Sequence, residues 1–102
     1  MRSQEDARFL RALGTEVREI RRDRGLNQDR LAERAGMSKQ MVSKIECGHR
    51  SGHNVVFLWR LTRALDVPLS VVVDAAARDL AYRRASAHLG RRPDRGLAPR
   101  RR

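Results

Sequence analysis

The stretch GLNQDRLAERAGMSKQMVSKIECG, residues 25–48, contains two short helical patterns with a glycine between them. Asn27 is a favourable N-cap for the first pattern, and Gly36 ends that pattern after about two turns. Ser38 is an equally favourable cap for the second pattern, which reaches Cys47. The stretch therefore predicts two short helices joined by a tight turn.

The apolar residues of this stretch indicate how the two helices pack. Leu31 and Ala32 face the interior, and the small side chain of Ala32 lies where the helices cross. Val42 and Ile45 pack the second helix against the interior. Two short helices joined by a turn that contains glycine form a helix-turn-helix. We therefore expect this motif at residues 28–48.

Helices are also predicted on both sides of the motif. Before it, residues 7–24 carry apolar side chains at spacings of three and four, which is typical of a surface helix. After it, Asn54 can begin a fourth helix, which Pro68 ends by pushing Val67 out of helical geometry. A fifth helix begins at Leu69. The side chains expected to face inward from these three helices are Phe9, Leu10, Leu13, Val17, Ile20, Leu58, Leu61, Leu65, Leu69, Val72, Val73, Ala76 and Leu80.

These elements predict an all-α fold of five helices in one compact domain, residues 1–89. A chain of 102 residues has the usual size of a single domain. The final segment RRPDRGLAPRRR has no periodicity, two prolines and mostly arginine. We therefore expect residues 90–102 to form a disordered basic tail.

The charge of the chain points to a polyanionic partner. There are 23 basic and 12 acidic residues, giving a formal net charge of +11 and an isoelectric point near 11.6. Residues 83–102 contain eight arginines and one aspartate, so the net charge of the rest of the chain is closer to zero. Aromatic residues are scarce, and no catalytic triad, phosphate-binding glycine loop or carboxylate pair stands out. We therefore expect double-stranded DNA as the partner, no enzymatic activity and no cofactor.

Nothing in the sequence indicates export or membrane insertion. No apolar run approaches the roughly 18 residues that cross a bilayer, and the first residues are too polar for a signal peptide. Cys47 is the single cysteine and cannot form an internal disulfide, as expected in a reducing compartment. These features predict a cytoplasmic, nucleoid-associated protein without a membrane partner.

One face of the helix that follows Ser38 carries the groups that base recognition requires. At 100° per residue, one arc away from the packing side holds Lys39, Gln40, Ser43, Lys44 and Cys47. Lysine can donate to guanine O6 and N7, and glutamine can pair with adenine N6 and N7. Both lysines of the chain lie on this face. The alternative, which spacing alone leaves open, is an ordinary solvated helix face.

Three segments, LGTEVREIRRDRGLNQDRLAERAG, MSKQMVSKIECG and FLWRLTRALDVPLSVVV, together carry a family resemblance. They span residues 13–73 and resemble the phage-repressor or Cro type of helix-turn-helix transcriptional regulators, also called the xenobiotic response element type. The resemblance implies a lambda-repressor-like arrangement of five helices around one core. It also implies dimers that bind two half-sites about one turn of DNA apart.

The resemblance assigns roles to residues at matching positions. Gln28 resembles the glutamine that binds a phosphate and braces the recognition helix. Arg21 and Glu46 match a pair that, in some members of the family, forms an internal salt bridge between the first and third helices. The chain departs from the family pattern at Cys47, where polar residues are common, and in the loop at residues 49–54, which lacks the usual proline. The positions that resemble base-reading and groove-contacting residues are Ser38, Lys39, Gln40, Ser43 and Lys44.

A second apolar stripe is expected on the fifth helix. Val71, Ala75 and Tyr82 share a face away from the side that packs inward. We expect this stripe to form a dimer contact, which Trp59 of the fourth helix joins. The alternative is scattered apolar surface, which is common on monomers.

Cys47, His49 and His53 invite comparison with a metal site. Structural zinc normally takes four protein ligands and only three are close in sequence, so we expect no metal. A redox role for Cys47, whose thiol would lie near Lys44, is a minor alternative.

These observations predict a sequence-specific DNA-binding transcriptional regulator. It would be a repressor or autoregulator that binds a near-palindromic operator as a homodimer. One alternative is an antitoxin that binds a toxin protein and regulates its own operon. Another is a nonspecific nucleic-acid coating protein, which would bind all DNA equally, whereas a sequence-specific protein discriminates by about 4 to 10 kcal/mol.

Overall fold

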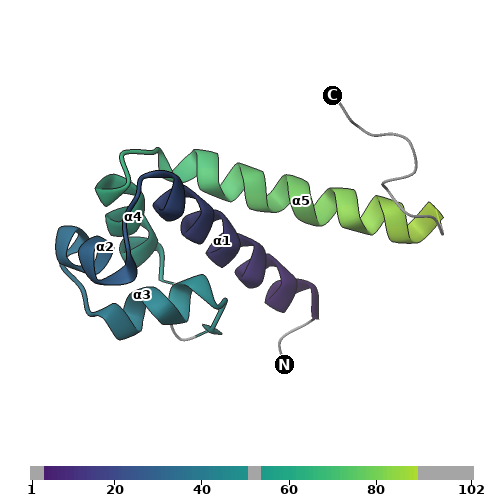
Figure 1. Ribbon diagram of the computed structural model, residues 1–102. Helices are drawn as coiled ribbons and strands as arrows, with labels where there is room; N and C mark the ends of the chain where they lie inside the picture. Colours follow the sequence, from purple (N-terminus) through teal and green to yellow (C-terminus); the bar gives the residue numbers. More distant parts are fainter. Residues whose placement is uncertain (1–3, 51–53, 90–102) are drawn as a thin grey trace.

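The structure is a computed structural model that describes residues 4–50 and 54–89. In these residues it contains five helices and no strand (Figure 1), which confirms the all-α prediction. The tail expected at residues 90–102, and His53, lie outside the described residues. The helices are α1 (Gln4–Asp23), α2 (Gln28–Ala35), α3 (Lys39–Glu46), α4 (Val55–Ala64) and α5 (Leu69–Leu89).

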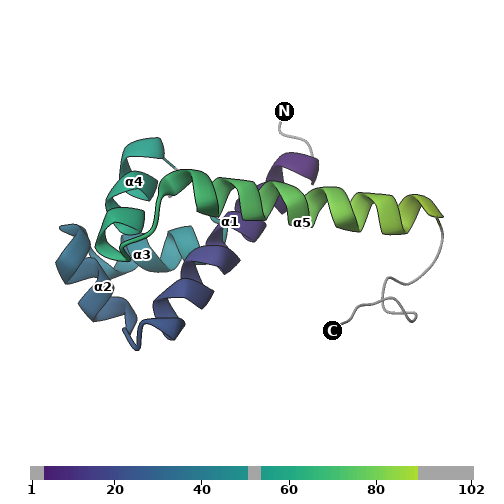
Figure 2. The ribbon, with the colours of Figure 1, turned by 90° about the horizontal axis from the view of Figure 1, so that it is seen from above.

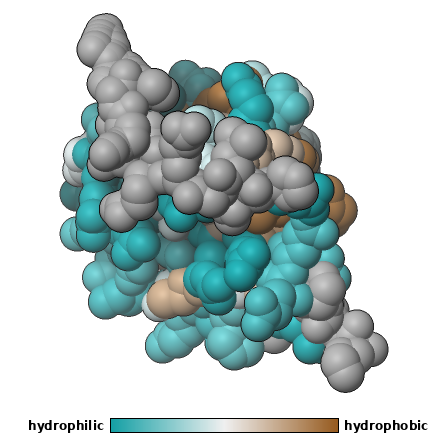
Figure 3. Space-filling model, turned by 90° about the vertical axis from the view of Figure 1, so that its right-hand side faces the viewer, coloured by the Kyte–Doolittle hydropathy of each residue, from teal (hydrophilic) through white to brown (hydrophobic). Residues whose placement is uncertain are grey.

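The helices form a cluster with one long arm. α2, α3 and α4 gather at one end, where α3 contacts both α1 and α2, and α4 contacts α2. α5 packs across α1 and then runs on past the beginning of α1 (Figure 2). Seen from the end where α1 begins and α5 ends, the described surface is mostly hydrophilic, with a smaller apolar area (Figure 3). No helix of the described chain is long and apolar enough to span a membrane.

The hydrophobic core combines aliphatic side chains from every helix. Phe9 and Phe57 lie partly buried against its edge, and no aromatic ring is fully buried in the described chain. Burying one leucine, isoleucine or valine stabilises a fold by about 1.5 to 3 kcal/mol. The inward residues predicted for the helix-turn-helix are all buried. The core consists of Leu13, Val17, Leu31, Ala32, Ala35, Val42, Ile45, Leu58, Leu61, Leu65, Val72 and Ala76.

The end of α4 differs from the prediction. Asp66 takes a left-handed conformation with φ of 61°. Its N–H donates to the Arg63 carbonyl at 3.0 Å, and the Val67 N–H donates to the Thr62 carbonyl at 2.9 Å. Aspartate tolerates this conformation better than most side chains, so the chain has already turned at Asp66. The prediction that Pro68 ends the helix is therefore wrong.

Two boundary residues also differ from expectation. Val73 was expected to face inward but is 37% exposed, because α5 packs through Val72 and Ala76 and Val73 lies to one side of them. α3 ends at Glu46, and Cys47 is its C-cap rather than part of the helix. Neither difference changes which side of α3 or α5 faces the core.

Candidate nucleic-acid interface

Local hydrogen bonds fix the beginnings of the two motif helices. Asn27 Oδ1 accepts a hydrogen bond from the Arg30 N–H at 2.8 Å, and Ser38 Oγ accepts one from the Met41 N–H at 3.1 Å. Both residues are N-caps, as the sequence predicts. Between the helices Gly36 closes α2 with φ of 70°. Together these bonds set the direction in which α3 leaves the turn.

α3 has one packed side and one outward side. Val42 and Ile45 are fully buried on the packed side. On the other side lie the four polar residues selected from the sequence, three of them exposed and the serine half-buried. We call this surface the outward face of α3; it consists of Lys39, Gln40, Ser43 and Lys44.

A buried ion pair joins α1 to α3. Arg21 Nε and Nη2 donate to Glu46 Oε2 and Oε1 at 2.6 and 3.0 Å, so the pair is bidentate. Arg21 Nη1 also donates to the Leu26 carbonyl, at 2.8 Å, in the turn between α1 and α2. Because one guanidinium group bonds to both α3 and this turn, it fixes the position of α3 on the domain.

Gln28 extends this network to α2. Its Nε2 donates to Glu46 Oε1 at 3.0 Å, the same oxygen that accepts a hydrogen bond from Arg21 Nη2. The amide carries a second N–H, which has no acceptor within the described chain. Gln28 therefore ties α2 to α3 and retains one donor for a partner.

Gly14 and Gly48 allow α3 to lie close to α1. Neither glycine was assigned to the site from the sequence. A Cβ atom built on Gly14 would lie 2.5 Å from the Glu46 carbonyl oxygen, and one built on Gly48 would lie 2.7 Å from Arg11 Cα. A side chain at Gly14 would therefore displace the backbone of α3. The available signal was Gly14 itself, because an isolated glycine inside a helical pattern costs about 1 kcal/mol and usually has a packing reason.

Lys39 has an acidic neighbour on α2. Its Nζ lies 3.8 Å from Asp29 Oδ2, and both side chains are more than half exposed. An exposed pair of this kind contributes about 0 to 1 kcal/mol, so Lys39 can exchange it for a stronger acceptor. Lys44, the other lysine of the outward face, makes no ion pair within the described residues.

The residues expected at a dimer contact lie on two helices. Val71 and Tyr82 are 48% and 55% exposed on one face of α5, and the half-buried Ala75 lies between them. Trp59 lies on α4, with the guanidinium carbon of Arg63 4.8 Å from its ring centre. The structure therefore gathers the three α5 residues on one surface and leaves Trp59 on a different helix.

The residues considered for metal binding do not form a cluster in the described chain. Cys47 is exposed as a free thiol. No group of three histidine, cysteine or acidic side chains among the described residues is placed to hold a metal ion.

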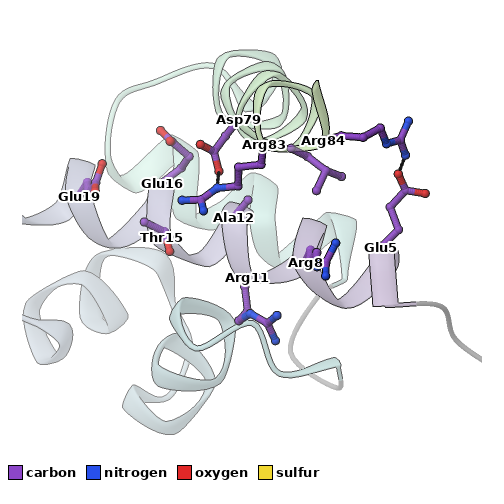
Figure 4. Close-up of a pocket in the computed structure, with 11 residues that line it drawn as sticks. Glu5, Arg8, Arg11, Ala12, Thr15, Glu16, Glu19, Asp79, Arg83 and Arg84 are labelled. Carbon is purple, nitrogen blue, oxygen red and sulfur yellow. Dashed lines mark hydrogen bonds and ion pairs between the residues drawn. The ribbon is translucent and has the colours of Figure 1, made fainter. Parts of the chain in front are cut away.

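A charged hollow of about 840 Å³ lies between α1 and α5 (Figure 4), and no residue of the outward face lines it. An ion pair between Arg84 and Glu5 bridges the two helices at its rim. Burial raises the pKa of the Glu16 carboxyl, and the charges of Glu19 and Asp79 raise it further. The walls carry both signs of charge, so this hollow is not part of a positive binding surface.

Comparison with known proteins identifies chains that share this sequence pattern. Residues 17–72 match a family described as helix-turn-helix. The HTH-type transcriptional regulator SutR of Escherichia coli (strain K12) is 38% identical over 65 residues. This match covers 64% of the present chain and only 36% of SutR.

Two solved structures share the arrangement of helices. The clp gene regulator ClgR from Corynebacterium glutamicum has a TM-score of 0.70 and 28% identity, covering 80% of this chain and 86% of that chain. The restriction-modification controller protein C.AhdI from Aeromonas hydrophila has a TM-score of 0.59 and 32% identity, covering 62% of this chain and 94% of that chain. The similarity therefore extends beyond the motif to the surrounding helices.

Proposed function

Because this chain belongs to the helix-turn-helix family of DNA-binding transcriptional regulators, we propose that it is a repressor or autoregulator that binds a near-palindromic operator as a homodimer. It would act in the cytoplasm, on the chromosome. The operator is recognised by α3, which enters the major groove with its outward face toward the bases.

The rigid support beneath the outward face is the observation that carries this proposal. Base recognition requires side chains held by a fixed scaffold, whereas mobile basic side chains add affinity without sequence specificity. Arg21 and Gln28 both bond to Glu46, and these bonds hold α3 against the two preceding helices. The lysines of the outward face can donate to guanine, its glutamine can pair with adenine, and its serine can donate or accept.

We assign phosphate contacts to Gln28 and Ser38. Each lies at the beginning of a motif helix, where free N–H groups and the helix dipole attract anions. Gln28 uses one amide hydrogen on Glu46, which leaves the other to donate to a phosphate oxygen. Ser38 Oγ accepts the Met41 N–H, so the hydroxyl hydrogen remains available for donation. These contacts set the register of α3 in the groove.

The dimer contact is assigned to the exposed stripe of Val71, Ala75 and Tyr82 on α5. In a symmetric dimer this stripe would pack against its own copy. Val71 and Tyr82 are already exposed on α5, so a second copy can reach the stripe without rearranging the core. Two α3 helices would then enter successive major grooves about 34 Å apart, which requires an operator with two-fold symmetry.

Selection of bound duplexes from a random pool tests this proposal as a whole. The full chain is expected to enrich an inverted repeat whose half-site centres lie about 10 base pairs apart. The selected duplex should bind at least about 1,000-fold more tightly than random duplex at the same salt concentration. Equal affinity for both would contradict base recognition, and enrichment of a single half-site would contradict the dimer.

A further inference from the structure

The C-terminal part of α2 and the exposed side of α4 line a second, open hollow of about 430 Å³. We call it the α2–α4 hollow. No residue of the outward face of α3, and neither Gln28 nor Ser38, lines it. It is lined by Arg34, Ala35, Trp59, Arg60, Arg63 and Ala64.

Within the described chain, no acidic side chain neutralises the positive charge of this hollow. Three of its lining residues are arginines, none is acidic, and no carboxylate of the described chain pairs with any of the three. Elsewhere on the described chain several arginines do find acidic partners, at distances that permit ion pairs. Those arginines are Arg21, Arg78, Arg83 and Arg84. The hollow therefore presents a concentrated positive charge to solvent.

The large apolar ring of Trp59 lies among these three arginines. Trp59 is 48% exposed, and the Arg63 guanidinium carbon lies 4.8 Å from the centre of its ring, within the range of a cation–π interaction. Val56, three residues earlier on the same exposed side of α4, is also half exposed. Tryptophan and arginine are the residues most enriched at the energetically dominant positions of protein interfaces.

We propose that the α2–α4 hollow is the docking site for an acidic segment of a second protein, one that places an apolar side chain on Trp59 and carboxylates on Arg34, Arg60 and Arg63. Charge complementarity combined with exposed apolar area favours this partner. Duplex DNA would satisfy the arginines, but its backbone offers only the edges of the sugars, and no protruding apolar side chain, to cover Trp59.

A second copy of this chain fits the hollow less well. In a symmetric dimer the hollow would face itself, because both copies use the same surface. Such a contact would bring two sets of three arginines together, and like charges in an interface cost free energy. Trp59 is therefore assigned to a different partner from the α5 stripe, and the protein could hold this partner while α3 occupies DNA.

A titration followed through tryptophan fluorescence tests the proposal, because Trp59 is the only tryptophan of the chain. The probe is a synthetic 12-residue peptide of aspartate and glutamate with one central Leu-Phe pair, added to the full chain. We expect a saturable change in Trp59 emission. A peptide with lysine in place of every acidic residue should give none, and an all-acidic peptide without the Leu-Phe pair should bind at least tenfold more weakly.

Charge-reversal variants locate the binding surface. Arg60→Glu combined with Arg63→Glu should weaken peptide binding at least tenfold. The control, Arg8→Glu combined with Arg78→Glu, changes the net charge equally at exposed positions outside the hollow and should bind as the wild type does. Circular dichroism of both proteins checks that the helices are intact.

Four results would overturn the proposal. The first is that the wild type does not bind the peptide, and the second is that the control variant weakens peptide binding equally. The third is that Arg60→Glu/Arg63→Glu loses affinity for random duplex while its peptide binding is unchanged. The fourth is that this variant converts a dimer to a monomer. The third result would assign the hollow to DNA, and the fourth would assign it to a second copy of the chain. Light scattering and anisotropy of a labelled 20-base-pair duplex measure these two outcomes.

Discussion

The guanidinium group of Arg21 holds the carboxylate of Glu46 in a buried, bidentate ion pair, with nitrogen–oxygen distances of 2.6 and 3.0 Å. Glu46 is the last residue of α3, and Ser38 caps the beginning of the same helix. The outward face lies between these two attachments. A change at either attachment should therefore alter DNA binding without touching a residue of that face.

Removing one partner of the ion pair should destabilise the fold strongly. Arg21→Ala leaves the Glu46 carboxylate buried without a counter-charge, which costs about 3 to 5 kcal/mol. Urea denaturation followed by circular dichroism measures the free energy of unfolding. The matched control is Arg78→Ala, whose exposed pair with Asp74 should contribute at most about 0.5 kcal/mol. Equal losses in the two variants would contradict the structural role of the pair.

Gly14→Ala should destabilise the protein even though alanine favours helices. Helix propensity alone predicts a gain of about 1 kcal/mol. The added Cβ would, however, lie 2.5 Å from the Glu46 carbonyl oxygen, and overpacking of this kind typically costs about 1 to 3 kcal/mol. Urea denaturation decides between the two effects, and a higher midpoint for Gly14→Ala would show that α1 and α3 are not in close contact.

The Glu16 carboxyl should make the fold less stable at neutral than at acid pH. Burial first, and then the charges of Glu19 and Asp79, raise its pKa in the folded protein. The stability linked to this group is therefore present below the unfolded-state pKa and is lost as the pH rises through the folded-state pKa. Glu16→Gln should raise the melting temperature at pH 7. This gain should disappear as the pH falls through the ordinary pKa range of a glutamate carboxyl.

Thermal melts of Glu16→Gln across this pH range measure the effect. Glu33→Gln, an exposed change of the same chemistry on α2, is the matched control. A gain that is the same at every pH, or no gain at pH 7, would show that the Glu16 carboxyl is not penalised by its surroundings.

Charge placed on the α5 stripe should separate the proposed dimer. Val71→Asp combined with Tyr82→Asp would bring four carboxylates together in a symmetric contact, so the mass measured by light scattering should fall to that of a monomer. Ala77→Asp, exposed on a different side of α5, should leave the mass unchanged. An unchanged dimer in the double variant would exclude the stripe as the contact.

The features that the sequence predicted well depend on residues close together in the chain. Asn27 and Ser38 each bond to a backbone N–H three residues ahead, so the caps could be inferred from residue type and position. The apolar spacing likewise indicated which side of α3 is buried. The Cro-type resemblance is confirmed by the family match over residues 17–72.

The features that were missed depend on contacts between distant segments. Gly14 signals a close contact, but nothing near it in the sequence identifies the carbonyl groups of α3 as its neighbours. Asp66 was missed because a left-handed aspartate has no strong sequence signal when a proline follows. The α2–α4 hollow could not be foreseen either, because Arg34 belongs to another helix and lies 25 positions from Trp59 in the chain.

We propose above all that the outward face of α3 recognises base pairs. The most direct test measures the affinity of Lys39→Ala and Lys44→Ala for the selected operator and for operators that carry each single base-pair change, at one salt concentration. Each variant is expected to lose about 1 to 3 kcal/mol on the operator and to relax its preference at one base pair. Gln28→Ala should instead weaken operator and random duplex by similar factors, because Arg21 still holds Glu46 and the lost phosphate contact carries no sequence information. If both lysine variants keep the affinity and the base preferences of the wild type, the outward face does not recognise DNA sequence.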